Sequence, residues 1–250
     1  MTLVVPPWAA SVVESLPYPV VFATVSGAHL YGFASVDSDL DLRAAHLLPL
    51  PELIGLRHGP ETVQVGGDRD GVELDVVSHD LLKFARLMLK PNGYVLEQVL
   101  SPLVVATSPL HRELIELVPA CLTANHVQHY LGFAAGQWGL FQRSGELKPA
   151  LYTLRVLLTG LHLMRTGEIE ADLRNLWPDA DLPYAGALIE AKVSGEHRTL
   201  TSDLVDPARL ASDVARLEEA LKSARETTHL PTHPTAADAM HALLIRARLT

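Results

Sequence analysis

The chain has 250 residues, a formal net charge of −9, 48% hydrophobic residues and 20% charged residues. This composition is typical of a folded globular protein and argues against a disordered chain or a non-specific binder of nucleic acid or anionic membrane, while a local basic site stays open. The single cysteine, Cys121, excludes an intramolecular disulfide and a cysteine-based zinc site.

The first part of the chain predicts mainly β-strands. Short segments rich in β-branched residues and separated by Gly and Pro are typical of strands. They cover residues 18–27, 40–50, 61–67 and 71–78. One helix interrupts them at residues 81–90, where Asp80 is placed to cap its start and Pro91 follows its end.

From residue 105 onward the apolar residues recur at helical spacing. The predicted helices cover residues 109–122, 125–142, 148–167, 206–226 and 235–249. Strands followed by helices predict an α+β fold, with an N-terminal mixed β-sheet domain over residues 1–105 and a C-terminal helical domain over residues 106–250. No apolar run is long enough to span a membrane and no basic segment precedes the apolar N-terminus, so we expect no membrane span, no signal peptide and a cytoplasmic location.

Two carboxylates lie two residues apart at the start of the second predicted strand. Side chains two residues apart share a face of a strand, so Asp39 and Asp41 should point the same way while Leu40 and Leu42 pack into the core. Paired carboxylates repel each other unless a cation lies between them, and Mg²⁺ suits such a site. A turn closed by Asx hydrogen bonds is the alternative for an isolated Asp-x-Asp.

Neighbouring residues favour the metal interpretation. Gly27 and Gly32 lie just upstream, where glycine lets backbone N–H groups approach an anionic ligand. Asp75 interrupts the apolar strand 71–78, an unfavourable place for an unpaired acid. A shared metal would explain all three acids.

These motifs together resemble those of a known superfamily. The order of apolar strand, glycine turn, Asp-x-Asp strand and later acidic strand resembles the polymerase-β-type nucleotidyltransferases. More narrowly, residues 27–43, GAHLYGFASVDSDLDLR, resemble the RlaP-like predicted nucleotidyltransferases, whose pattern is G-S-x-x-Y-G-x-x-x-x-x-S-D-x-D-x-R. The resemblance continues through residues 81–102 and 148–169, and Ala28 replaces the usual serine.

The resemblance implies a catalytic domain over residues 1–105 and a helical domain over 106–250 that contributes to the substrate cleft. It implies that Asp39, Asp41 and Asp75 hold two Mg²⁺ ions, or Mn²⁺, which clamp a nucleoside triphosphate, with Asp75 beside the attacking hydroxyl. The residues that it implies, or that their charge and spacing suggest, for nucleotide binding are Gly27, Ala28, Gly32, Ser38, Arg43, Lys148, Tyr152 and Arg155. Arg43 either reaches a phosphate or pairs with Asp41, and Ser26 or Ser38 could replace the hydroxyl that Ala28 lacks.

The expected function is transfer of a nucleoside monophosphate from an NTP, with ATP as the plausible donor, to an acceptor hydroxyl. The RNA-repair association of RlaP-like proteins implies an RNA or tRNA end as acceptor. A small molecule such as an aminoglycoside, or a protein hydroxyl, is the rival acceptor. A catalytically weakened nucleotide sensor or interaction module is the alternative from another class, and Ala28 supports it.

Overall fold

The computed structural model describes residues 5–195 and 197–249, and these form two compact units. Unit 1 contains the chain up to Leu30, the segment Asp39–Cys121 and the chain from Pro234 onward. Unit 2 contains Tyr31–Ser38 and Leu122–His233. The chain therefore leaves unit 1 twice, once for the short segment 31–38 and once for a long helical segment.

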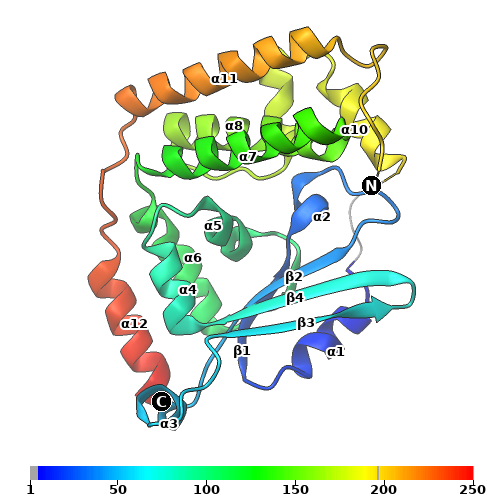
Figure 1. Ribbon diagram of the computed structural model, residues 1–250. Coiled ribbons are helices and arrows are strands. Elements are labelled where there is room, and N and C mark those ends of the chain that lie inside the picture. The colour runs from blue at the N-terminus through cyan, green and yellow to red at the C-terminus, as the bar shows by residue number, and fades with distance from the viewer. Residues whose placement is uncertain (1–4, 196, 250) are drawn as a thin grey trace. The chain divides into compact units, whose positions relative to one another are not determined.

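A mixed sheet with the strand order β3-β4-β2-β1-β5 is the centre of unit 1 (Figure 1). Its strands are β1 Val20–Val25, β2 Leu40–His46, β3 Thr62–Arg69, β4 Val72–Asp80 and β5 Val104–Ala106. β2 and β4 are parallel neighbours, whereas the other adjacent pairs run antiparallel. The four predicted strands and the α+β fold class are confirmed; β5 was not predicted because it has only 3 residues.

Helices cover both faces of this sheet. They are α1 Trp8–Glu14, α2 Gly27–Tyr31 (whose last residue belongs to unit 2), α3 Leu50–Ile54, α4 Leu81–Met88, α5 Gly93–Leu100, α6 Pro109–Cys121 and α12 Ala237–Leu249. Alternation along the strands decides which side chain meets which helix. Val25 and Ala23 of β1 pack in one cluster with Ala9, Val12 and Val13 of α1. Phe22 turns to the other face, where its ring lies 5.2 Å from Phe84 of α4 and 4.5 Å from His111 of α6.

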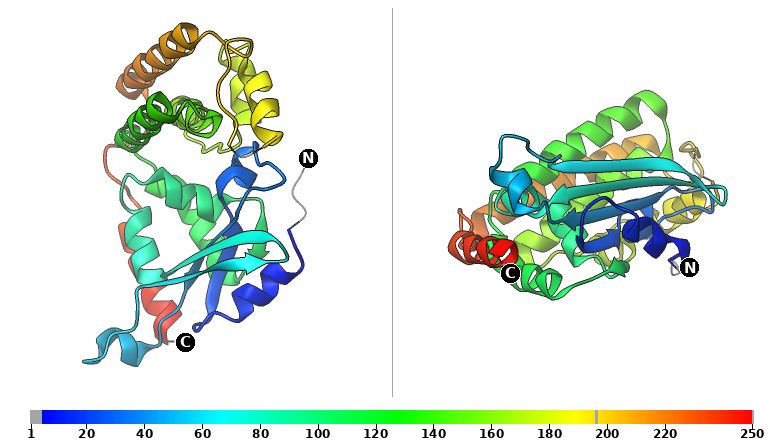
Figure 2. Two further views of the ribbon diagram at one scale, coloured as in Figure 1. Left: turned by 45° about the vertical axis from the view of Figure 1, so that its right-hand side comes forward. Right: turned by 90° about the horizontal axis from the view of Figure 1, so that it is seen from below.

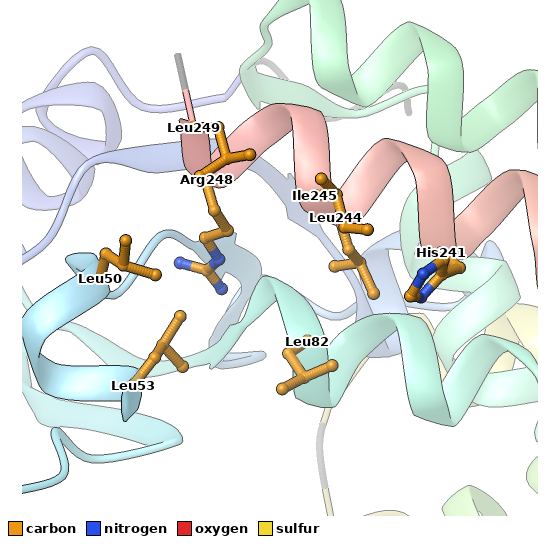
Figure 3. Close-up of a pocket in the computed structure, with 8 residues that line it drawn as sticks. All are labelled: Leu50, Leu53, Leu82, His241, Leu244, Ile245, Arg248 and Leu249. Atoms are coloured by element: carbon orange, nitrogen blue, oxygen red, sulfur yellow. The ribbon is translucent and has the colours of Figure 1, made fainter. Parts of the chain in front are cut away.

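The last helix, α12, is fixed to unit 1 by a buried ion pair. Arg248 Nη2 donates to both carboxylate oxygens of Asp80, at 2.9 and 2.6 Å. Asp80 also caps α4, as predicted, by accepting from Leu82 N at 2.9 Å. Beside this pair lies an apolar hollow of about 360 Å³ between α3, α4 and α12, and Arg248 is turned inward there among leucine side chains (Figure 3).

Unit 2 is helical. It contains α7 His126–Ser144, α8 Leu147–Thr166, α9 Leu173–Leu176, the 3₁₀ helix η1 Trp177–Asp179, α10 Ala185–Val193 and α11 Pro207–Thr227. α7 and α8 form a hairpin that turns at Gly145, whose φ of 69° is a left-handed conformation suited to glycine. α8 is buried along most of its length, and α11 packs against it. Asp206 caps α11 as predicted, accepting from Ala208 N at 2.9 Å.

The predicted boundary at residue 105 differs from the division into units. The sequence placed α6 and α12 in a helical domain, but both belong to unit 1: α6 packs with β1 of the sheet, and α12 packs with α4 and α6. The long helical segment leaves unit 1 after Cys121 and returns at Pro234, and Thr235 N donates to Ala120 O at 2.8 Å where the two ends meet. Both views in Figure 2 show α12 beside the helices that cover the sheet. Over the described ranges, no helix combines the length and apolar character needed to cross a bilayer.

Candidate active site

Two acidic side chains meet on one face of the sheet in unit 1. Parallel pairing places Asp41 of β2 opposite Asp75 of β4, so both carboxylates project from the same face. Leu40 and Leu42, on either side of Asp41 in β2, point to the opposite face of the sheet and are buried. Asp39 precedes β2 by one residue, shares the alternation of Asp41 and is exposed. The strand register thus brings together two of the three predicted acids.

Arg43 joins the two carboxylates. Its Nη2 donates to Asp41 Oδ1 at 2.7 Å and to Asp75 Oδ2 at 2.8 Å. Because one nitrogen binds both oxygens, the carboxylates lie within two hydrogen-bond lengths of each other. Nη1 donates to the carbonyls of Leu42 and Asp75, each at 3.0 Å, and Nε donates to the Tyr94 hydroxyl of α5 at 2.9 Å. Of the two roles considered for Arg43, pairing with Asp41 is the one observed.

Electrostatics keep this guanidinium charged. Burial by itself lowers the pKa of Arg43, since a charged group loses solvation. Tyr94, Asp41 and Asp75 outweigh that effect, and the pKa of Arg43 ends well above its usual value. The positive charge of Arg43 offsets the repulsion between the two acids. Arg43 therefore supplies the cation that two carboxylates so close together require.

Gly27 lets the acidic pair approach the chain segment that follows β1. Its φ of 63° lies in the left-handed region, and a Cβ built there would lie 1.9 Å from Asp41 Oδ2. A side chain at this position would displace the carboxylate. Ala28 next to it is buried. Ser26, on the other side, has a buried hydroxyl with no hydrogen-bond partner among residues 5–195 and 197–249, and its N–H donates to Asp41 O at 2.9 Å.

The donor set at Asp41 and Asp75 fits one Mg²⁺, which proteins usually hold through one or two carboxylates, with waters and substrate phosphates completing the shell. Asp41 and Asp75 supply two carboxylates, and Ser26, whose N–H donates to Asp41 O, has a buried hydroxyl with no hydrogen-bond partner among the described residues. Within the described part of the chain, no three His, Cys, Asp or Glu side chains gather closely enough to hold an ion. The observed geometry therefore offers a two-carboxylate site, and participation of Asp39 stays a prediction.

The other predicted nucleotide-binding residues belong to unit 2. Gly32, with φ of 86°, lies against the Asp172 and Arg174 side chains, since a Cβ there would be 2.1 Å from Asp172 Oδ1. Ser38 Oγ accepts from Ser35 N at 3.0 Å, which closes the loop 35–38. The close approach at Gly32 is thus to side chains of unit 2. Among the described residues, the Ser26 hydroxyl lacks a hydrogen-bond partner, whereas the Ser38 hydroxyl has one.

Lys148, Tyr152 and Arg155 follow one another along α8, as their spacing predicts. Arg155 is buried, with its guanidinium carbon 3.7 Å from the centre of the Tyr31 ring and 5.9 Å from that of Tyr152. Lys148 and Tyr152 are partly exposed. Binding of triphosphate by these three residues stays a prediction.

Sequence reasoning missed one member of the site, Tyr94. It lies 51 positions after Arg43 and reaches it from α5. Pro91 and Gly93, just before Tyr94, indicated the end of α4, and for that reason the start of α5 at Gly93 was not predicted. The only available signal was the continued apolar spacing after Gly93.

Comparison with known proteins assigns the family. The family described as "RNA repair pathway DNA polymerase beta family", RlaP, matches residues 9–246. The chain belongs to the RlaP family. The matched residues include parts of both units.

Two proteins that resemble this RlaP-family chain can be named. An uncharacterized protein of Methanocaldococcus jannaschii is 31% identical over 155 residues, which are 61% of this chain and 63% of the relative, so the chain spans less than two thirds of that protein's length. A crystal structure of a nucleotidyltransferase-like protein from Exiguobacterium sibiricum has 13% identity and a TM-score of 0.34, covering 95% of this chain and 76% of the other. A structural likeness at this level carries no inference about activity.

Proposed function

We propose that this RlaP-family chain is a Mg²⁺-dependent nucleotidyltransferase that transfers a nucleoside monophosphate from an NTP to a hydroxyl at an RNA end. The observation that carries the proposal is the in-register pair Asp41 and Asp75, held together by Arg43 beside the Gly27 turn. Membership of a polymerase-β family supports the reaction class. ATP as donor and a cytoplasmic location remain the simplest expectations.

In this proposal the acceptor oxygen forms a bond to the α-phosphorus while the bond to pyrophosphate breaks. The ion would be held by Asp41 and Asp75, with Asp39 on the same face, and would supply neutralisation of phosphate charge. Asp75 is the more exposed of the paired acids, with 51% of its side chain accessible against 25% for Asp41. It is therefore the carboxylate that an incoming hydroxyl can reach and give its proton to.

Arg43 positions these acids. Its hydrogen bonds to two strands and to α5 fix the separation of the carboxylates before any substrate arrives. Fixed charges that need no rearrangement during the reaction are the main source of catalysis in such transfers.

The test uses the four α-labelled NTPs with Mg²⁺ and RNAs that differ in their 3′ and 5′ ends. We expect label to enter RNA with the wild-type chain and to fall by at least about 10²-fold with Asp41→Asn or Asp75→Asn. Asp70→Asn is the matched control, since Asp70 lies in the β3–β4 turn with a φ of 56° that asparagine tolerates. Equal transfer by Asp41→Asn and wild type would contradict the proposal.

A nucleotide sensor is the second candidate, and two observations favour it. Arg43 already occupies the carboxylates that an ion would use, and Ala28 removes a hydroxyl from the turn. Binding of NTP by the wild-type chain without transfer to any RNA, small-molecule or protein acceptor would support this candidate over the enzyme.

A further inference from the structure

An aromatic row runs along the α7–α8 hairpin of unit 2. His129 and Phe133 are one helical turn apart on α7, with ring centres 6.4 Å apart. The Phe133 ring lies 6.3 Å from that of Tyr152 on α8, with the two planes inclined by 25°. All three side chains are partly exposed, whereas Tyr31 and Phe33, which meet Tyr152 edge-on from the segment 31–38, are buried. His129, Phe133 and Tyr152 are therefore the outer, partly exposed layer of an aromatic cluster. Tyr31 and Phe33 form its inner layer and are buried in the core of unit 2.

The helix surface beside Phe133 is open. A Cβ built at Gly132 or at Gly136 would meet no described atom within 4 Å. Gly136 is three residues after Phe133 and thus adjoins its ring on the helix surface. Each glycine in a helix interior costs about 0.5–1 kcal/mol relative to alanine. The helix is thus less stable at Gly136, where a larger side chain would lie next to the Phe133 ring.

Cations accompany this surface. α7 and α8 carry Arg143, Lys148, Arg155 and Arg165, with Glu146 as the sole acid of residues 126–167, although the whole chain is acidic. Arg143 is exposed and lies back along α7, with Nη1 3.4 Å from where a Cβ of Gly139 would be. Lys148 is one turn before Tyr152 on α8. The aromatic row therefore has a positive side chain on each of its two helices.

We propose that His129, Phe133 and Tyr152 form a stacking platform for unpaired bases of single-stranded RNA, with Arg143 and Lys148 contacting the phosphates. Stacking of successive bases on aromatic rings along a positive surface is how proteins bind single strands without reading their sequence. A single nucleotide would need one ring, whereas a row of three suits a strand. The proposal rests on the proposed function, because it supplies a binding surface for the RNA acceptor.

Binding of a fluorescent oligoribonucleotide of about 12 nucleotides, followed by anisotropy in EDTA and without NTP, tests the platform. We expect Phe133→Leu, which keeps the apolar volume and loses the ring, to weaken binding by about tenfold. Trp138→Leu is the matched control, since Trp138 is a partly exposed aromatic residue on another face of α7. Arg143→Gln should reduce the slope of log K against log salt by about 0.7, and Arg165→Gln, at the far end of α8, should leave it unchanged.

Several results would overturn the platform. They are unchanged RNA binding by a folded Phe133→Leu chain, an equal loss with Trp138→Leu, or a mononucleotide that competes as well as the strand. Asp41→Asn separates this proposal from the proposed function. RNA binding that persists in Asp41→Asn and falls in Phe133→Leu supports the platform even where no transfer is detected, whereas transfer without any effect of Phe133→Leu on RNA binding supports the enzyme alone.

Discussion

Replacing Arg43 by methionine is the most informative perturbation of the acidic site. The change keeps much of the aliphatic stem and removes all five hydrogen bonds that the guanidinium donates. Breaking a buried ion pair from one side costs about 3–5 kcal/mol, because it leaves an uncompensated charge. Water reaches the acids here, since 51% of the Asp75 side chain is accessible, and this reduces the expected loss to about 2 kcal/mol.

Thermal unfolding measures the effect. A loss of about 2 kcal/mol lowers the Tm of a chain of this size by about 4–8 °C. The matched control is Arg86→Met, because Arg86 and Glu61 form an exposed pair at 4.0 Å and should contribute less than about 1 kcal/mol.

Mg²⁺ should then stabilise Arg43→Met more than it stabilises the wild-type chain, because the ion no longer competes with the guanidinium for Asp41 and Asp75. At a hundredfold excess over its Kd, a bound ion contributes about 2.7 kcal/mol, enough to restore the lost stability. Mn²⁺ binding followed by electron paramagnetic resonance reports the same change directly. An unchanged Tm in Arg43→Met, or equal stabilisation of both chains by Mg²⁺, would refute this account of the site.

Three further predictions concern other parts of the molecule. Gly27→Ala should lower both stability and transfer more than Gly71→Ala, because both glycines have a positive φ but only the first would place a Cβ against Asp41 Oδ2; circular dichroism and the transfer assay compare them. Burial lowers the pKa of His126 to about 4, so as the pH falls below about 6.5 the unfolded chain takes up a proton before the folded chain does. The free energy of unfolding should therefore fall by about 2–3 kcal/mol between pH 6.5 and pH 4. His126→Gln should reduce this pH dependence, as measured by urea titrations. Arg248→Met should cost about 3 kcal/mol in the same titrations, since Asp80 is almost fully buried, and a loss below about 1 kcal/mol would show that the pair does not hold α12 in place.

The sequence allowed much of the acidic site to be predicted. Alternation alone places Asp39, Asp41 and Arg43 on one face of a strand and the leucines between them in the core. The opposition of Asp41 and Asp75 could not be derived in this way, because β4 pairs with β2 in parallel while β3 lies outside it. The order of the strands in the sheet depends on tertiary packing, which cannot be derived from a local sequence pattern.

The division of the chain was harder to predict for a related reason. α6 and α12 have the same amphipathic spacing as the helices of unit 2, and spacing does not say which partner a helix packs against. The partners are settled by contacts far apart in sequence, such as His111 on Phe22 and Arg248 on Asp80. The aromatic row is also set by such a contact, since the alignment of the α7–α8 hairpin decides that Phe133 meets Tyr152.

The return of the chain to unit 1 after Pro234 has a consequence for synthesis on the ribosome. The sheet and its first helices emerge early, but the segment that carries Arg248 emerges only after the whole of 122–233. Until then Asp80 lacks its buried cation, while the helices of 122–233 have already left the exit tunnel. Unit 1, which carries the acidic pair, is therefore begun before residues 122–233 are made and completed after them. A newly made chain should therefore form the buried Asp80–Arg248 pair only after residues 122–233 have been synthesised.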